Sequence, residues 1–232
     1  MTENEFVYYT KELGIDITDD ILNKLTMYYE LLVTWNEKMN LTGITDKKDV
    51  YLKHFYDSLT MCKVIDLNKE NTLCDIGTGA GFPGMVIKIC FPHIHLTLVD
   101  SLNKRLIFLK EVVNILNLDD VEIIHARAED YALKNRELFD IVTARAVAST
   151  PILLEYCIPL VKENKYFIAL KGKEDIKSCE NALNKLNCVV EKLIIFELPF
   201  EESTRTIIKI KKNKTTSLKY PRKYNEMKKY PL

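Results

Sequence analysis

The spacing of apolar residues changes once along the chain, near Thr72. Before this position, apolar side chains recur every third or fourth residue, as in an amphipathic helix that buries one face. One such run starts at Ile21 and predicts a helix that ends near Gly43, and a second run predicts a helix over residues 46–64. We therefore expect residues 1–66 to form an N-terminal helical extension.

After residue 72, short apolar runs typical of strands alternate with helical stretches. The predicted strands are TLCDI (72–76), HLTLVD (95–100), VEIIHA (121–126), FDIVTA (139–144), YFIALK (166–171), CVVEKLIIFEL (188–198) and RTIIKIKK (205–212), and the predicted helices are 83–90, 102–116, 151–160 and 173–186. This order predicts an α/β core over residues 67–212. We expect a Rossmann-like, doubly wound, seven-stranded and mostly parallel sheet, and its last two strands should form an antiparallel hairpin at one edge.

A glycine-rich loop follows the first predicted strand, in the string TLCDIGTGAGFPGMVIK (72–88). Four of the seven glycines of the chain stand here, at Gly77, Gly79, Gly81 and Gly84. Glycine adopts backbone angles that side chains forbid, so the concentration indicates a loop shaped for a ligand. A plain glycine turn with an Asp cap is the alternative.

Two nucleotide cofactors are compatible with this loop. The string GAGFPG (79–84) matches the GxGxxG pattern of dinucleotide-binding proteins. In that pattern a pyrophosphate sits on backbone amides, and the carboxylate of Asp75 just before the loop would repel it. S-adenosylmethionine instead carries a cationic sulfur and amine, so Asp75 favours this cofactor. Asp100, about twenty residues after the loop, is placed to accept hydrogen bonds from ribose hydroxyls with either cofactor.

The net charge of the chain is zero, but its C-terminal part is basic. Residues 205–232 contain ten Lys or Arg against Glu226 alone. Such a segment attracts polyanions, and the interleaved Tyr220, Tyr224 and Tyr230 offer stacking surfaces for RNA bases. We predict a basic tail over residues 213–232, and a merely solvated terminus is an equally open interpretation.

The cysteines, the histidines and the first residues of the chain argue against metalloproteins, disulfide-linked proteins and membrane proteins. The six cysteines form no CxxC pair and the four histidines are scattered, so we expect no metal site and no disulfide framework. The start MTENEF has neither a basic nor an apolar run, and no stretch is apolar enough for a membrane span. We expect a cytoplasmic monomer with no membrane partner.

Several motifs together resemble the RsmG family, also called GidB, of bacterial methyltransferases that act on guanine N7 in 16S ribosomal RNA. They are WNEKMNLTGITD (35–46), HFYDSL (54–59), DIGTGAGFPG (75–84), LVDSLNKRLIFLKEV (98–112), RAED (127–130), RAVAS (145–149), ALKG (169–172) and YPRK (220–223). The resemblance covers nearly the whole chain.

The resemblance implies S-adenosylmethionine as cofactor and 16S ribosomal RNA, or the small ribosomal subunit, as partner. With the loop argument above, the expected cofactor-binding residues are Asp75, Gly77, Gly79, Gly81, Phe82, Asp100, Ala128, Glu129 and Arg145. The expected RNA contacts are His54, Lys104, Arg105, Lys171, Arg205, Arg222 and Lys223. Lys104 and Arg105 could instead be solvated, and Arg205 could pair with a carboxylate.

The chemistry implied by the resemblance needs no general base, because guanine N7 carries a lone pair and no proton. Catalysis then consists of positioning the reactants and excluding water. Arg145 or Lys171 is expected to position the base by donating to guanine O6. A non-catalytic RNA-binding protein of the same fold and a nicotinamide-dependent oxidoreductase are the alternatives.

Overall fold

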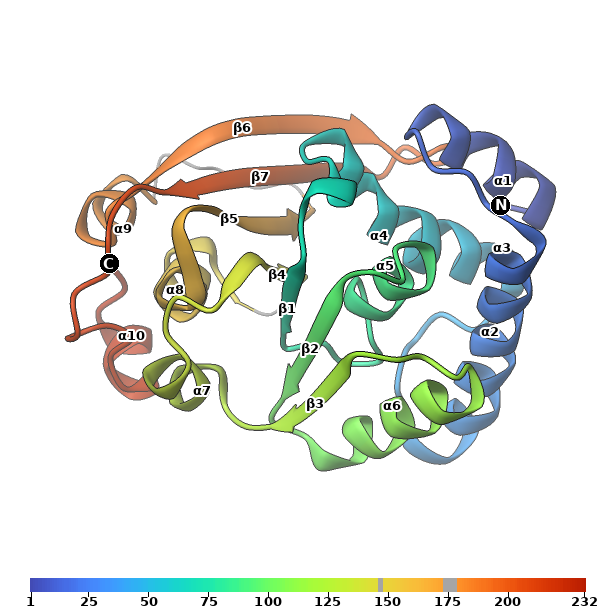
Figure 1. Ribbon diagram of the computed structural model, residues 1–232, viewed down its shortest axis with the longest axis horizontal. Coiled ribbons are helices and arrows are strands. Elements are labelled where there is room, and N and C mark those ends of the chain that lie inside the picture. The colour runs from blue at the N-terminus through green and yellow to red at the C-terminus, as the bar shows by residue number, and fades with distance from the viewer. Residues whose placement is uncertain (146–147, 173–178) are drawn as a thin grey trace.

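The computed structural model describes residues 1–145, 148–172 and 179–232, which contain one seven-stranded sheet (Figure 1). Its strands lie in the order β3-β2-β1-β4-β5-β7-β6. Their bounds are β1 Thr72–Ile76, β2 His95–Asp100, β3 Val121–His125, β4 Phe139–Arg145, β5 Val161–Lys171, β6 Cys188–Glu197 and β7 Thr204–Lys212. β7 is antiparallel to both β5 and β6, and the other pairings are parallel. The predicted α/β fold with an antiparallel edge hairpin is confirmed.

Helices cover both faces of this sheet. Their bounds are α1 Glu3–Glu12, α2 Asp19–Met39, α3 Lys47–Val50, η1 Tyr51–Tyr56, α4 Asp57–Leu59, η2 Thr60–Lys63, η3 Leu67–Lys69, α5 Gly84–Cys90, α6 Asn103–Ile115, α7 Ala128–Lys134, α8 Thr150–Cys157, η4 Ile158–Leu160, α9 Glu180–Lys185 and α10 Tyr224–Lys229. The elements before β1 share one hydrophobic core with α5, α6 and one sheet face, whereas α7 to α10 pack on the other face. Within the described ranges, none of these helices is long and apolar enough to cross a membrane.

The helical extension differs in detail from the prediction. α2 ends at Met39 rather than near Gly43, because Asn40 adopts the left-handed conformation (φ 48°) and its amide bonds the carbonyl of Asn36. The run from residue 47 to 63 is helical as expected but passes through α, π and 3₁₀ geometry. α1 was not predicted, although Thr2 and Glu5 form the capping box that starts it.

The core also contains unpredicted features. α7 follows β3, where no helix was predicted, and supplies the crossover that two parallel strands require. β5 starts five residues before the predicted strand. Of the helix predicted over 173–186, residues 173–178 lie outside the described part, and α9 accounts for most of the remainder.

The basic C-terminal segment folds back onto the core. The Arg136 guanidinium donates to the carbonyls of Tyr220 (2.7 Å) and Thr216 (2.6 Å). Tyr220, Met227 and Leu232 are buried against the face that carries α7 and α8. The segment is therefore anchored by both hydrogen bonds and apolar contacts.

Candidate active site

A cleft of about 470 Å³ opens at the carboxyl ends of β1 and β2 and reaches the start of α7. Its volume falls in the range of small-molecule sites. Its walls include most of the expected cofactor residues, namely Gly77, Gly79, Phe82, Asp100, Ala128, Glu129 and Arg145. Asp75 and Gly81 do not line it.

Two glycines give the loop its path along the cleft. Gly77 has a φ of 67° and Gly79 a φ of 62°, in the left-handed region that side chains avoid. The Gly77 amide donates to the carbonyl of Val99 (2.8 Å), and the Gly79 amide donates to Asp100 Oδ2 (2.9 Å). These bonds tie the loop to the end of β2.

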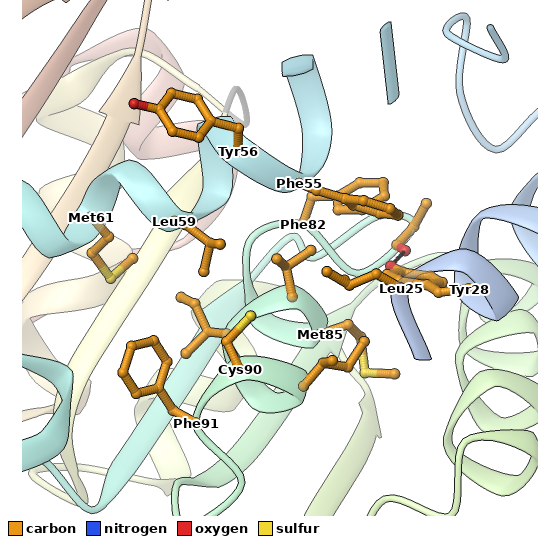
Figure 2. Close-up of a cluster of buried hydrophobic side chains, with 14 of the residues drawn as sticks. Leu25, Tyr28, Phe55, Tyr56, Leu59, Met61, Phe82, Met85, Cys90 and Phe91 are labelled. Atoms are coloured by element: carbon orange, nitrogen blue, oxygen red, sulfur yellow. Dashed lines mark hydrogen bonds between the residues drawn. The ribbon is translucent and has the colours of Figure 1, made fainter. Parts of the chain in front are cut away.

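Gly81 has a packing role. Its φ is 99°, and a Cβ at this position would lie 2.5 Å from the hydroxyl of Tyr28 and 2.7 Å from Cγ of Met85. Figure 2 shows Tyr28, Phe55, Phe82 and Met85 gathered in this cluster, where the Tyr28 ring lies 5.6 Å from that of Phe55 and 5.5 Å from that of Phe82. The Tyr28 hydroxyl also donates to the carbonyl of Ala80. The cluster therefore fixes the loop from below.

Asp75 is fully buried beneath the loop. Its Oδ2 accepts hydrogen bonds from Thr78 Oγ1 (2.7 Å) and from the Gly84 amide (3.0 Å). Its Oδ1 is buried and has no partner in the part of the chain that the structure describes. Burial raises the pKa of this carboxyl to about 6, so it is mostly ionised at neutral pH. An unsatisfied anionic oxygen under the loop fits a cationic cofactor and opposes a pyrophosphate.

Asp100 organises the neighbouring corner of the cleft. Its Oδ1 accepts from the amide of Leu102 (2.8 Å), and its Oδ2 accepts from Arg105 Nη1 (3.2 Å) as well as from the Gly79 amide. Arg105, expected to contact RNA, thus forms an internal ion pair at the cleft wall. Lys104 points elsewhere and donates to the carbonyl of Met39 at the end of α2 (3.2 Å).

Arg145, at the end of β4, joins three elements. Its Nη1 donates to the carbonyl of Lys53 (3.1 Å) and to Asp57 Oδ2 (3.3 Å). Its guanidinium also lies 5.2 Å from the ring centroid of Phe82. Arg205, from β7, donates through Nε to Asp57 Oδ1 (3.2 Å), so Asp57 bridges two arginines. The predicted alternative for Arg205, pairing with a carboxylate, is confirmed.

His54 is held as a neutral ring beside Arg145. Burial and the charge of Arg145 lower the pKa of His54 to about 3. Its Nδ1 lies 3.3 Å from Arg145 Nη2 and its Nε2 lies 2.9 Å from Thr42 Oγ1. The always protonated Arg145 can only donate to Nδ1, which places the ring hydrogen on Nε2, although Nδ1 also lies 3.2 Å from the carbonyl of Lys53. The ring stacks on Phe82 with 4.4 Å between centroids.

A second hollow of about 320 Å³, here called the side pocket, adjoins the cleft. His54 and Arg145 line both spaces. The remaining polar lining of the side pocket is Lys53, Asp57, Lys171, Arg205 and Thr206. Of the residues expected to meet the substrate, the structure therefore brings together His54, Arg145, Lys171 and Arg205. The Lys171 Nζ donates a hydrogen bond to the carbonyl of Ala148 (2.6 Å).

The two remaining expected RNA contacts lie apart from the side pocket. Arg222 donates through Nε and Nη2 to both oxygens of Glu155, at 2.8 and 2.7 Å. The Glu155 side chain is only 1% exposed, so Arg222 anchors the C-terminal segment. Lys223 is exposed before α10, whose Tyr224 lines the cleft.

Sequence reasoning assigned no role to Thr42 and Asp57, and it placed Tyr224 in a base-stacking tail and not in the cleft wall. Asp57 had a usable signal, since it follows His54 by three residues in a helical stretch and therefore shares its face. Tyr224 reaches the cleft only because the chain folds back.

Known proteins resemble the chain over its full length. A family model described as GidB, rRNA small subunit methyltransferase G, matches residues 21–208. The Ribosomal RNA small subunit methyltransferase G of Bacillus velezensis is 50% identical, and the alignment covers 100% of this chain and 99% of that protein. The protein of the same name from Bacillus subtilis is 48% identical with the same coverage. A solved structure of a SAM dependent methyltransferase from Aquifex aeolicus has a TM-score of 0.56 and 17% identity, covering 77% of this chain and 97% of that chain.

Proposed function

Because the chain belongs to the rRNA small subunit methyltransferase G family, we propose that it transfers a methyl group from S-adenosylmethionine to N7 of a guanine in 16S ribosomal RNA. The family, the enzyme class and the cofactor predicted from the sequence are confirmed. Membership favours this activity over the nicotinamide-dependent and non-catalytic alternatives. We also propose that the enzyme is monomeric and metal-independent and that it works in the cytoplasm.

The cleft supplies the groups that the cofactor needs. Gly77, Gly79 and Phe82 offer a close backbone and an apolar ring, and Asp100 and Glu129 offer carboxylates for hydroxyl or amine donors. The buried, ionised Asp75 adds negative potential beneath the loop. When bound, S-adenosylmethionine supplies an electrophilic methyl group attached to a cationic sulfur.

The residues of this chain act by positioning. Guanine N7 needs no proton removed, so a general base is unnecessary, and holding two reactants in line contributes roughly 7 to 11 kcal/mol. Arg145 lies where the cleft and the side pocket meet and carries donors suited to guanine O6. His54, neutral and stacked on Phe82 with 4.4 Å between ring centroids, gives this junction a flat, uncharged surface beside Arg145.

The observation that carries the proposal is the junction itself, a cofactor cleft that shares Arg145 and His54 with a second, cationic pocket. Transfer of a tritiated methyl group from S-adenosylmethionine to unmethylated small ribosomal subunits, followed by mapping of the nucleotide, tests it. Naked 16S RNA assayed in parallel identifies the form of the substrate.

The cofactor has a separate readout. S-adenosylhomocysteine is expected to raise the melting temperature, and NAD is not. Arg145→Ala is expected to lower turnover on subunits. Absence of methyl transfer to either substrate, or unchanged turnover and cofactor affinity in Arg145→Ala, would contradict the proposal.

A further inference from the structure

We propose that the side pocket binds the acceptor base and that Asp57 selects guanine by accepting hydrogen bonds from its N1–H and N2–H₂ groups. The inference rests on the proposed function and adds to it a pocket and a specificity-determining residue.

The side pocket lies beside the cofactor cleft, where the base that accepts the methyl group must lie. It is formed by the ends of β4 and β5, through Arg145 and Lys171, and by the start of β7. β7 is antiparallel to β5, so Thr206 is the register partner of Lys171 and reaches the same edge of the sheet. The π-helix η1 completes the wall with Lys53 and His54, and Asp57 follows directly. A base in this pocket faces the cleft across His54 and Arg145.

An unsatisfied polar atom points to a ligand at this place. Thr206 is 1% exposed and lines the side pocket. Its hydroxyl oxygen is buried without a hydrogen-bond partner among residues 1–145, 148–172 and 179–232. Leaving such a group unpaired is unfavourable, and a polar ligand would relieve that cost. Asp75, buried beneath the neighbouring glycine loop, has a second oxygen of this kind, the unpaired Oδ1.

The donors and acceptors of the pocket match one base. Guanine presents N7 and O6 as acceptors and then N1–H and N2–H₂ as donors along adjoining edges. Arg145 offers donors at the boundary with the cleft, and Asp57, 3.3 Å from it, offers acceptors next to them. With N7 toward the cleft, O6 meets Arg145 and the two donors meet Asp57. Adenine would place the lone pair of its N1 against the carboxylate.

Asp57 has the capacity for this contact. Each of its oxygens accepts a bond from one arginine, at 3.3 Å from Arg145 and 3.2 Å from Arg205, and a carboxylate oxygen accepts two. The two arginines hold the carboxylate in place, and with Lys171 they give the pocket a cationic lining that suits a nucleotide phosphate.

A purely structural ion pair is the rival explanation, and nucleotide selectivity separates the two. We would titrate the full-length protein, saturated with S-adenosylhomocysteine, with GMP, IMP and AMP, and follow binding by NMR. IMP lacks only the N2 amine, and AMP lacks the N2 amine, N1–H and O6. GMP is expected to bind at least about fivefold more tightly than IMP, and AMP is expected to bind most weakly.

Variants assign the selectivity to Asp57. Asp57→Asn is expected to abolish the preference for GMP over IMP. The matched control is Asp140→Asn, because Asp140 is also a buried aspartate with two cationic partners, Lys162 (3.0 Å) and Lys165 (3.6 Å), but lies at the opposite end of β4. The control should keep the preference. If Asp57→Asn does not fold, Thr206→Val tests the same pocket and should weaken GMP binding about two- to tenfold.

The outcomes are distinct from those of the methylation assay. Equal affinity of the wild-type protein for GMP and IMP, or an unchanged preference in folded Asp57→Asn, would overturn the inference even if subunits are methylated. Selective GMP binding without methylation of subunits would instead contradict the proposed function and support the inference about the side pocket.

Discussion

Alanine substitutions at two neighbouring glycines of the loop should separate folding from ligand binding. Gly81 and Gly79 both have positive φ values, 99° and 62°, but their surroundings differ. A Cβ at position 81 would collide with three side chains, whereas a Cβ at position 79 would meet only the carbonyl of Gly77 at 4.0 Å. Gly79 lines the cleft and Gly81 does not.

The expected cost at position 81 has two parts. A side chain at this backbone angle costs about 1 to 3 kcal/mol, and forcing a methyl group into a packed cluster costs about 1 to 3 kcal/mol more. The cluster cannot yield easily, because the fully buried Tyr28 is held by its bond to Ala80 and stacks on Phe55. Gly81→Ala should therefore destabilise the fold by about 2 to 6 kcal/mol, and Gly79→Ala by only about 1 to 2 kcal/mol.

Urea unfolding at equilibrium measures both costs, and titration with S-adenosylhomocysteine measures binding. For a chain of this size, Gly81→Ala should lower the melting temperature by roughly 5 to 20 °C. Gly79→Ala should weaken S-adenosylhomocysteine binding more than its small loss of stability would suggest, since the new methyl group faces the cleft. The reasoning fails if Gly81→Ala is no less stable than Gly79→Ala.

Three further predictions follow from buried charges and thiols. Burial raises the pKa of Asp75 to about 6, from about 4 in the unfolded chain, so the folded protein binds this proton more readily. The free energy of unfolding should therefore rise by up to about 3 kcal/mol as the pH falls from 6 to 4. Asp75→Asn should remove this trend in urea unfolding. Arg222→Ala removes the cationic partner of the buried Glu155 and leaves it with the hydrogen bond from the amide of residue 222, so it should cost about 3 to 5 kcal/mol and speed hydrogen exchange in α10. Lys229→Ala, at the exposed end of that helix, should do neither. Five of the six cysteines are buried, and burial raises the pKa of the sixth, Cys62, to about 12. A thiol reagent at pH 8 should therefore react slowly with the folded protein, and quickly with all six thiols once urea unfolds it.

The sheet was predictable because its signals are local. Strand residues such as those of TLCDI and HLTLVD are apolar runs bounded by turn residues, and both fall at their predicted positions. The errors lie where several local signals compete. α2 could end at either Asn40 or Gly43, and the left-handed Asn40 prevails. α7 is short and mostly polar outside Tyr131 and Ala132, so its pattern was weak, although the parallel strands on either side require a connection there.

The site was predictable in its residue types but not in its pairings. The cleft collects residues of the four motifs at the ends of β1, β2, β3 and β4, because these strands end at the same edge of one sheet. The bridge at Asp57 joins residues that are 88 and 148 positions apart, so no periodicity reveals it. No pattern of residues indicates that Gly81 packs against Tyr28 while Gly79 lines the cleft.

The Lys and Arg residues of the basic C-terminal segment are of two kinds in the structure, those that pair with carboxylates and those that are exposed. Arg205, Lys212 and Arg222 pair with Asp57, Glu137 and Glu155 respectively, so they stabilise the structure or shape a pocket.

Lys214, Lys219, Lys223, Lys228 and Lys229 are exposed instead. Exposed lysines attract any polyanion with strong salt dependence, whereas buried and oriented groups discriminate between bases. The exposed and the buried cations therefore fit different roles in the proposed function. We propose that the exposed lysines attract the RNA backbone and that the bridge of Arg145, Asp57 and Arg205 selects the base that enters the side pocket.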